Sequence, residues 1–484
     1  MKTKFSDLLR SGVCVAAIAA LSACASTSLA EPAPATSEAS AETAETIRYE
    51  WDLTDLYATP EAWEAAYTDV EARVATIESY KGTLGTSAAS MADAYRAVSD
   101  MAKDAVRLSV YANLKFAENQ GNAEAQERQG RARNLFQKFG EATSWMSPEL
   151  LSIDEARVRG FLAEEPRLEP FRFSIEDTLR QAPHTLDADG EALLAQAGLA
   201  LSQANQIYSL YANASIPWPS VTLADGTEVK LNQAGYGRYR AAENRDDRKK
   251  VFDTFWGAWE TYQNGMGATL NAQVQSSVFR ARARNYESVL QRNMFDDALP
   301  PEIYTELVDQ VNEALPVFHR YLKLRGRMLG VEDLRYYDIY PPIIEADTGV
   351  FDLERSEELT FEALKPFGEE YLALLRKGLD GDWMHSHPQE GKETGAYMSG
   401  SAYDVHPYVL LNHNDDYNSM STFAHEWGHA VHTELAKSEQ PWETAGYSTF
   451  IAEMASTINE ILLEEYMIEN AQTKEEKLYY LGYA

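Results

Sequence analysis

The 484-residue chain has little cysteine and little basic charge. Its two cysteines, Cys14 and Cys24, both lie in the first 24 residues. The body therefore cannot form an internal disulfide, and a metal ion there must be held by histidine and carboxylate groups rather than by thiolates. Lys plus Arg number 43 against 75 Asp plus Glu, giving a formal net charge of −32. A surface this acidic repels phosphate backbones, which argues against nucleic acid as a partner.

The N-terminus lacks an apolar run long enough to span a membrane. Three basic residues precede a short, mostly apolar stretch from Ser11 to Ala23, which predicts an export signal at residues 1–23. Leu21–Cys24 resembles the lipobox of bacterial lipoproteins, which predicts that Cys24 is lipidated and anchors the chain to a membrane. The alternative is ordinary cleavage after Ser28–Ala30. Both readings predict an exported protein of the periplasm or cell envelope, with membrane contact only through the lipid.

Residues 24–46 are almost entirely Ala, Ser, Thr, Pro and Glu, which predicts a disordered tether because such a segment cannot bury a core. Globular sequence follows, and we expect an N-terminal helical domain at 47–205 and a catalytic domain at 206–484. Apolar residues at three-and-four spacing predict that most of both domains is helical. The predicted helical stretches are 60–80, 88–118, 122–143, 188–211, 241–282, 301–329, 353–378, 418–437 and 446–470.

Only two regions have a β pattern. An Asp225–Gly226 turn between Val221–Leu223 and Val229–Leu231 predicts a hairpin. A second β-like region, rich in Tyr, Val and Leu, extends from Gly395 to His413. The predicted fold class is therefore mostly α, with a small β-sheet beside the helix at 418–437.

That helix carries the sequence H-E-x-x-H from His425 to His429. The two histidines lie one turn apart on one face, a spacing that lets both imidazoles bind one zinc ion. Glu426 lies at the rim of that face, where it can act as a general base toward the attacking water. Met420, Phe423, Trp427, Ala430 and Val431 form an apolar stripe beside the histidines. The alternative is a buried, hydrogen-bonded histidine pair without a metal.

A catalytic zinc ion needs a third protein ligand. The extended pattern H-E-x-x-H-x-x-G-x-x-H fails here, because positions 432 and 435 are His432 and Leu435. A glutamate on a following helix is the other completion. We predict Glu453, because a carboxylate within the apolar run Phe450–Thr457 is costly unless it is paired or bound to metal; a structural salt bridge is the alternative. Glu460, two turns on, is predicted to support a ligand histidine. The other glutamates considered are Glu434, Glu439 and Glu443.

Several segments resemble the oligoendopeptidase F branch of the thimet oligopeptidase family. They occur in the family's order between residues 47 and 484, and they include the F-x-A-E-x-x-S-T-x-N-E pattern whose first glutamate is the family's third zinc ligand. The matching segments are Trp51–Tyr57, Gly391–Tyr397, His406–Asn412, the H-E-x-x-H helix and Phe450–Glu460.

The resemblance implies a large helical body split by a deep channel, one zinc ion per chain and oligopeptide substrates, with folded proteins excluded. Gly395, Ala396 and Tyr397 would then form an edge that pairs with an extended peptide, although a plain tight strand without a ligand explains them too. We expect a monomer that hydrolyses internal peptide bonds. Attack at chain ends is a weaker alternative, and His432 is expected to be a solvent-facing or core residue rather than a cleft residue.

One departure from the family concerns its oxyanion donors, His and Tyr side chains far downstream of the zinc helix. Only 55 residues follow His429, too few to reach that segment. The simplest interpretation is an incomplete reading frame, and the other is a naturally shortened or inactive protein. Losing one oxyanion donor costs about 10²–10³ in rate, so a weakly active or inactive peptide-binding lipoprotein is the alternative function. Tyr479, Tyr480 and Tyr483 are expected to be packing aromatics.

Overall fold

The computed structural model describes residues 50–344 and 346–483. All of them lie in one compact unit, Ile47–Ala484. The predicted signal peptide, tether and lipidated Cys24 lie outside the described residues. The predicted division at residues 205 and 206 stays a prediction. Among the described helices, none combines the length and the apolar character that a membrane span requires.

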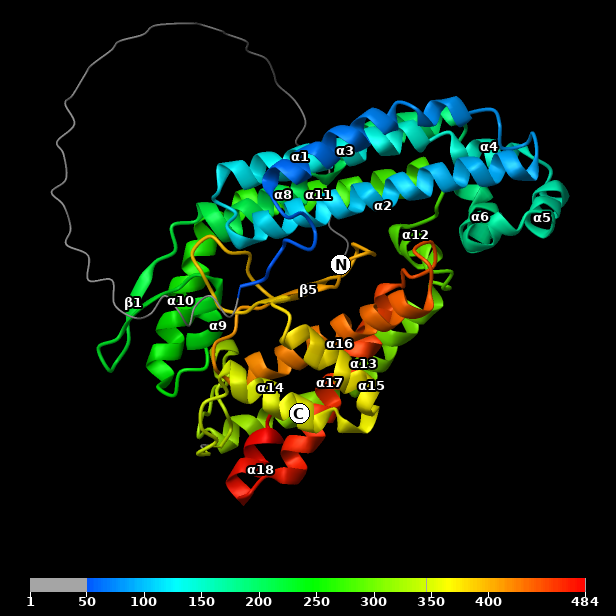
Figure 1. The fold of residues 1–484 in the computed structure, drawn as a ribbon. Helices are drawn as coiled ribbons and strands as arrows, with labels where there is room; N and C mark the ends of the chain where they lie inside the picture. Colours follow the sequence, from blue (N-terminus) through cyan, green and yellow to red (C-terminus); the bar gives the residue numbers. More distant parts are fainter. Residues whose placement is uncertain (1–49, 345, 484) are drawn as a thin grey trace, which may run out of the picture. The chain divides into compact units, whose positions relative to one another are not determined.

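The N-terminal half is a layered helical array in which α2 (Ala88–Glu118) and α3 (Ala123–Thr143) lie side by side (Figure 1). Helix α2 begins where the Ser87 hydroxyl accepts the Ser90 N–H at 3.1 Å, a capping bond that the first turn would otherwise lack. The remaining helices of this half are α1 (Pro60–Val74), α4 (Met146–Ser152), α5 (Glu155–Glu164), α6 (Arg172–Arg180), α7 (Ala188–Gln196) and α8 (Gly198–Leu210).

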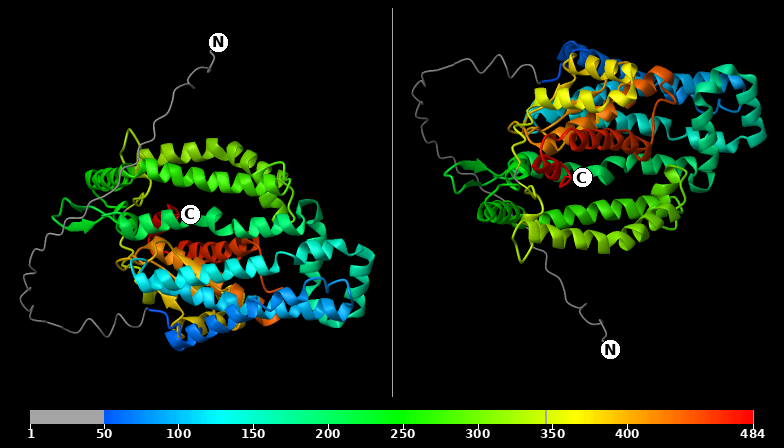
Figure 2. Two further views of the ribbon diagram at one scale, coloured as in Figure 1. Left: turned by 90° about the horizontal axis from the view of Figure 1, so that it is seen from above. Right: turned by 90° about the horizontal axis from the view of Figure 1, so that it is seen from below.

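The second half contains one hairpin and the remaining helices. The hairpin pairs β1 (Ser220–Thr222) with β2 (Glu228–Lys230) in antiparallel register, as its Asp-Gly turn predicts. The helices are α9 (Gln233–Tyr239), α10 (Arg245–Thr261), α11 (Gln263–Ala283), α12 (Val289–Asp296), α13 (Glu302–Met328), α14 (Leu353–Ala363), α15 (Glu369–Leu379), α16 (Tyr417–Glu439), α17 (Thr449–Asn470) and α18 (Lys474–Tyr480). Helices α16 and α17, orange and red in Figure 2, pack against each other.

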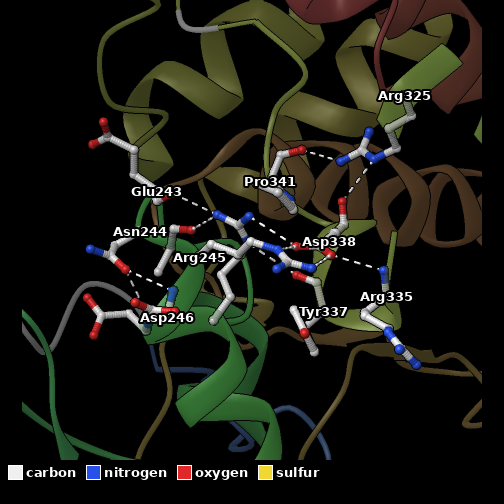
Figure 3. A network of polar contacts seen from close by, with 12 residues as sticks. Glu243, Asn244, Arg245, Asp246, Arg325, Arg335, Tyr337, Asp338 and Pro341 are labelled. Carbon is white, nitrogen blue, oxygen red and sulfur yellow. Dashed lines mark hydrogen bonds and ion pairs between the residues drawn. The ribbon is translucent and has the colours of Figure 1, made fainter. Parts of the chain in front are cut away.

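A buried aspartate joins α10 to the segment after α13. Asp338 is fully buried and accepts hydrogen bonds from Arg245 at 3.0 and 2.8 Å and from Arg248 at 3.2 Å, both on α10 (Figure 3). Arg325 of α13 donates to its backbone carbonyl at 3.1 Å. Removing one partner of such a cluster leaves a buried charge uncompensated, so the cluster fixes this part of the fold.

A three-stranded sheet lies beside α16, in the order β3 (Met384–His385), β5 (Tyr408–Leu410), β4 (Tyr397–Ser399). Strand β5 pairs with β3 in parallel and with β4 in antiparallel register. Strands β3 and β4 are thus the two edges of the sheet. Tyr408 and Leu410 point into the core of the N-terminal helices, whereas Val409 points into the core around α16. Both faces of β5 are buried, which explains why its sequence is continuously apolar.

The predicted mostly-α class is confirmed, and several predicted helices have the observed bounds within a few residues. Three predicted stretches are each two helices. The stretch 188–211 divides at Ala197, and 353–378 divides near Gly368, whose φ of +88° interrupts a helix. The stretch 241–282 divides at Tyr262. Strand β3 was not predicted, because two residues carry no periodic signal.

Candidate metal centre and peptide cleft

Helix α16 is held by its cap and by its apolar face. The Asp416 carboxylate accepts the Ser419 N–H at 2.8 Å and so begins the helix. The predicted apolar stripe, from Met420 to Val431, is buried, with Phe423 and Trp427 in one core. This packing fixes the rotation of the helix about its axis, and it directs His425 and His429 toward α17.

The three predicted metal ligands come together at the contact of α16 and α17. His425 Nε2 lies 3.2 Å from His429 Nε2. Glu453 Oε2, on α17, lies 3.4 Å from the first of these nitrogens and 3.6 Å from the second. Two zinc ligands with bonds of about 2.0–2.1 Å at a tetrahedral angle lie about 3.3–3.4 Å apart. The triangle of donor atoms therefore has the size that one zinc ion requires, and two imidazoles with one carboxylate are ligands that zinc accepts.

Glu453 does not lie in the apolar surroundings that its sequence context predicts. Its side chain is 52% exposed, and Phe450 and Met454 beside it are 59% and 52% exposed. The carboxylate is therefore not embedded in apolar surroundings, and no burial cost demands a partner. What distinguishes Glu453 is its direction, since it points from α17 at the two imidazole nitrogens.

Glu460 contacts His425 on the side of the ring that faces away from the other ligands, as the sequence predicts. Its Oε1 accepts a hydrogen bond from His425 Nδ1 at 2.8 Å. This contact raises the pKa of His425. The bond fixes the ring so that Nε2 faces His429 and Glu453, and a carboxylate in this position also makes Nε2 a stronger donor to a metal.

Glu426 is buried beside the ligand atoms. Burial raises the pKa of its carboxyl to about 7. Its Oε2 has no hydrogen-bond partner among the described residues, although the atom is inaccessible to solvent. A buried oxygen without a partner is unusual in a folded protein and commonly marks a catalytic group. Glu426 is thus available to hydrogen-bond a water molecule or a substrate.

The predicted substrate edge, Gly395, Ala396 and Tyr397, leads into strand β4. The N–H groups of Val409 and Leu411 bond to carbonyls on the β3 side of β5. Alternation along the strand then directs the backbone groups of Tyr408 and Leu410 to β4, and those of Met398 away from β5. The N–H and C=O of Met398 therefore face away from β5, where the N–H acts on the Glu426 carboxyl and partly offsets the effect of burial on its pKa, and the C=O faces the side on which another extended chain could pair. Tyr397 itself contacts Glu393 at 3.4 Å and packs on the N-terminal core.

A buried lysine, which the sequence analysis did not single out, fixes the loop before β4. Lys392 Nζ donates to three backbone carbonyls, those of His385 at 3.1 Å, His387 at 2.7 Å and Leu411 at 2.6 Å. Burial lowers its pKa to about 7. Asn412 also donates to the Gly395 carbonyl at 2.8 Å. Only the position of Lys392 between two glycines that precede a strand could have suggested its role.

A cleft of about 960 Å³ extends along β4. One wall is formed by side chains of α2, α3 and α8, and the other by β4, α16 and the loop before α17. The cleft approaches the metal ligands through Met398 and through Thr433, which lies one turn after His429. The ligands themselves do not line it. An extended chain lying on the free edge of β4 would occupy this cleft.

Three tyrosines near the end of the chain pack against the start of α16. His432 contacts Tyr447 with ring centroids 4.2 Å apart and ring planes tilted by 30°. Tyr479, Tyr480 and Tyr483 surround Tyr417 at 6.2, 5.5 and 4.8 Å. These aromatics hold α18 against the start of α16, and none of them is near the histidine pair in sequence or by a described contact.

Comparison with known proteins places this architecture in a family. The model of Peptidase family M3 matches residues 238–481, half of the chain, and that of Oligopeptidase F matches residues 149–217. The chain belongs to peptidase family M3. Its relatives include Oligopeptidase PepF of Bacillus subtilis, 34% identical over 90% of this chain, and Group B oligopeptidase PepB of Streptococcus agalactiae, 32% identical over 88%.

These relatives place the M3 chain in the oligoendopeptidase F branch, as the segments from Trp51 to Glu460 predicted. The crystal structure of oligoendopeptidase-F from Enterococcus faecium superposes with a TM-score of 0.67 and 29% identity, covering 87% of this chain and 70% of that one. The chain spans 64% of the Bacillus protein and 70% of the Streptococcus protein.

Proposed function

We propose that this M3 chain is a zinc-dependent endopeptidase that hydrolyses short to medium oligopeptides. The observation that carries the proposal is the triangle of His425 Nε2, His429 Nε2 and Glu453 Oε2, whose sides of 3.2, 3.4 and 3.6 Å fit one tetrahedral zinc ion. Membership of an oligopeptidase branch supports the substrate class.

The residues of this chain would hold the metal ion, orient one of its ligands and carry a proton. His425, His429 and Glu453 would hold the zinc ion, which would polarise the scissile carbonyl and lower the pKa of a water molecule. Glu426 accepts the proton of the attacking water and then passes it to the leaving amine, because its buried carboxyl has a pKa of about 7 and a free Oε2. Glu460 holds His425 in the orientation that presents Nε2.

The peptide lies as an added strand on β4. Met398, whose backbone faces away from β5, offers its C=O to the peptide backbone, and Gly395, with φ of +87° and no neighbouring atom within 4 Å of a Cβ at this position, leaves room for the approach. Main-chain pairing gives affinity that is independent of sequence. The cleft admits an extended chain, which favours oligopeptides over folded proteins.

We extend the proposal to the predicted location and assembly. Cys24 would carry the lipid that anchors an exported monomer at the cell envelope. Labelling of cells with a fatty-acid analogue tests this, since wild-type protein would incorporate label and a Cys24→Ala variant would not.

The catalytic proposal is tested with purified protein, zinc and a quenched fluorescent oligopeptide. Glu426→Gln is expected to keep one zinc ion per chain and to lose cleavage, whereas Glu453→Ala is expected to lose the metal, measured by elemental analysis. Glu439→Gln on α16 and Glu465→Ala on α17 are matched controls, because both side chains are exposed and away from the cluster. Cleavage by the Glu426→Gln variant, or full zinc in Glu453→Ala, would contradict the assignments. Bound zinc without cleavage in the wild type would favour a peptide-binding protein.

A further inference from the structure

The cleft beside β4 contains one arginine without an acidic partner. Arg133 of α3 lines the wall opposite β4. Among the described residues its side chain has a single hydrogen-bond partner, the amide oxygen of Gln206 on α8. Its Nε is buried and bonded to nothing described. Burial lowers the pKa of Arg133, and no nearby carboxylate offsets that effect.

An unpaired cation is unexpected in this protein, which has 75 acidic and 43 basic residues. Arg131, two residues away on the same helix, binds both carboxylate oxygens of Glu64 at 2.7 Å. Burying part of a guanidinium without a carboxylate costs free energy that the chain could have avoided by placing a neutral residue there. The cost is explained if a ligand supplies the missing anion.

The other charged groups of the cleft are already engaged. Lys437 Nζ donates to the carbonyls of Ala402 at 2.8 Å and Val405 at 2.7 Å. Glu443 is paired with Arg96 at 2.8 Å. Burial raises the pKa of Glu393, whose carboxylate contacts Tyr397 at 3.4 Å. Among the described residues that line the cleft, Arg133 is thus the one cation without a carboxylate or backbone carbonyl partner.

The surroundings of Arg133 suit a carboxylate. The same wall carries the neutral side chains of Asn113, Asn205, Gln206 and Ser209, whose amide and hydroxyl groups donate hydrogen bonds without adding charge. A guanidinium forms short, charge-assisted hydrogen bonds with a carboxylate, and these are stronger than bonds between neutral groups. The peptide backbone is neutral, so the anion must come from the end or the side chain of the peptide.

We propose that Arg133 binds a carboxylate of the oligopeptide lying on β4, so that this peptidase selects peptides carrying a negative charge at that point of the cleft. The inference rests on the proposed function, because it assumes that the peptide occupies this cleft. The carboxylate is either the C-terminus of the peptide or an Asp or Glu side chain. In the first case Arg133 also fixes the distance from the cleaved bond to the peptide end.

Binding is measured separately from cleavage, by fluorescence anisotropy in the zinc-loaded Glu426→Gln protein. Three labelled peptides of one sequence are compared: a neutral peptide with an amidated C-terminus, the same peptide with a free C-terminus, and the amidated peptide with one Gln replaced by Glu. At least one anionic peptide is expected to bind about ten-fold or more tightly than the neutral one. The anionic peptide that binds more tightly than the neutral one shows whether the carboxylate is the C-terminus or a side chain.

Arg133→Gln is expected to abolish this preference while leaving the affinity for the neutral peptide unchanged. Arg133→Lys, which keeps the charge, should retain part of the preference. Lys138→Gln is the matched control, because it removes one positive charge from the same helix at a side chain that binds Glu71 outside the cleft. Thermal unfolding checks that each variant is folded.

The inference is overturned if all three peptides bind equally or not at all, or if the preference survives in Arg133→Gln. Its failure differs from failure of the proposed function. If the Glu426→Gln protein prefers the carboxylate peptides but the wild-type protein does not cleave them, only the enzymatic proposal is refuted. Cleavage that is indifferent to the carboxylate would refute only the role of Arg133.

Discussion

At the scale of single residues, the candidate site depends on which atoms face the histidine pair. Glu453 and Glu460 are both on α17, two turns apart, yet one carboxylate faces the Nε2 atoms and the other faces His425 Nδ1. Their order along the helix gives them different roles. A ligand and its supporting group can therefore be tested separately.

Glu460→Gln is expected to weaken zinc binding by about 10–100-fold without changing which residues bind the ion, because the neutral amide no longer orients and polarises His425. Competition with a chelator of known affinity measures the change. Glu469→Gln, an exposed position further along α17, is the control. An unchanged zinc affinity in Glu460→Gln would mean that the 2.8 Å contact has no supporting role.

A second residue-scale prediction concerns acid stability. Burial lowers the pKa of His385 to about 3 from 6.5, so between these values the unfolded chain binds a proton that the folded chain does not. The free energy of unfolding therefore falls as the pH is lowered from about 6.5 toward 3, by up to about 1.4 kcal/mol per pH unit. His385→Gln should flatten this acid limb in urea unfolding, whereas His319→Gln at an exposed site should not. Parallel pH profiles for wild type and His385→Gln would contradict the prediction.

At the scale of elements, the site depends on how closely α16 and α17 approach. Gly428, inside the H-E-x-x-H motif, faces α17, and a Cβ there would lie 2.7 Å from Asn459 Nδ2 and 3.0 Å from Ser456 Cα. Ser456 is one turn after Glu453 on the same helix. A side chain at position 428 would therefore move the third ligand away from the histidines.

Gly428→Ala is expected to destabilise the fold by about 1–3 kcal/mol, as overpacking does, and to weaken zinc binding as well. Urea unfolding and metal titration measure the two effects. Gly257→Ala on α10 is the control, since nothing lies within 4 Å of the added Cβ, and it should be neutral or stabilising by up to about 1 kcal/mol. A Gly428→Ala protein with wild-type stability would show that the helices can separate freely.

Many of the helices and the cluster of metal ligands could be predicted from the sequence. The spacing of apolar residues predicts a helix at 88–118, and the helix is observed at Ala88–Glu118, where the Ser87 side chain caps it. The triad of His425, His429 and Glu453 was also chosen correctly as a spatial cluster. The sequence could not assign roles to Lys392 or to Arg133, which has no acidic partner among the described residues, because these roles depend on carbonyls and on a cleft formed by distant segments. The pairing of β3 with β5 could not be predicted for the same reason, because the two strands are distant in the sequence.

At the scale of the whole molecule, high net charge is combined with exposed apolar helix faces. Helix α13 exposes Leu307, Val311 and Phe318 by 59%, 53% and 53%, at helical spacing on one face. Helix α17 exposes a similar row from Phe450 to Ile461. Continuous apolar faces favour association, whereas a net charge of −32 opposes it.

We therefore expect the chain to be monomeric at low salt and to self-associate as salt rises, because the Debye length falls from about 10 Å at 0.1 M to about 3 Å at 1 M. Sedimentation velocity measures this. Replacing Leu307, Val311 and Phe318 together by Gln should suppress association, whereas Phe173→Gln, an exposed aromatic on α6, should not. Association that weakens with salt would indicate an electrostatic contact instead.

The three carbonyls around Lys392 have one more consequence. An amine reacts as a nucleophile only after it loses a proton, and this one is only 3% exposed and donates three hydrogen bonds to carbonyls. An acylating reagent can modify it only in molecules whose loop has transiently opened. The rate at which Lys392 is acylated, measured by mass spectrometry, would thus report how often the loop that supports the peptide edge opens.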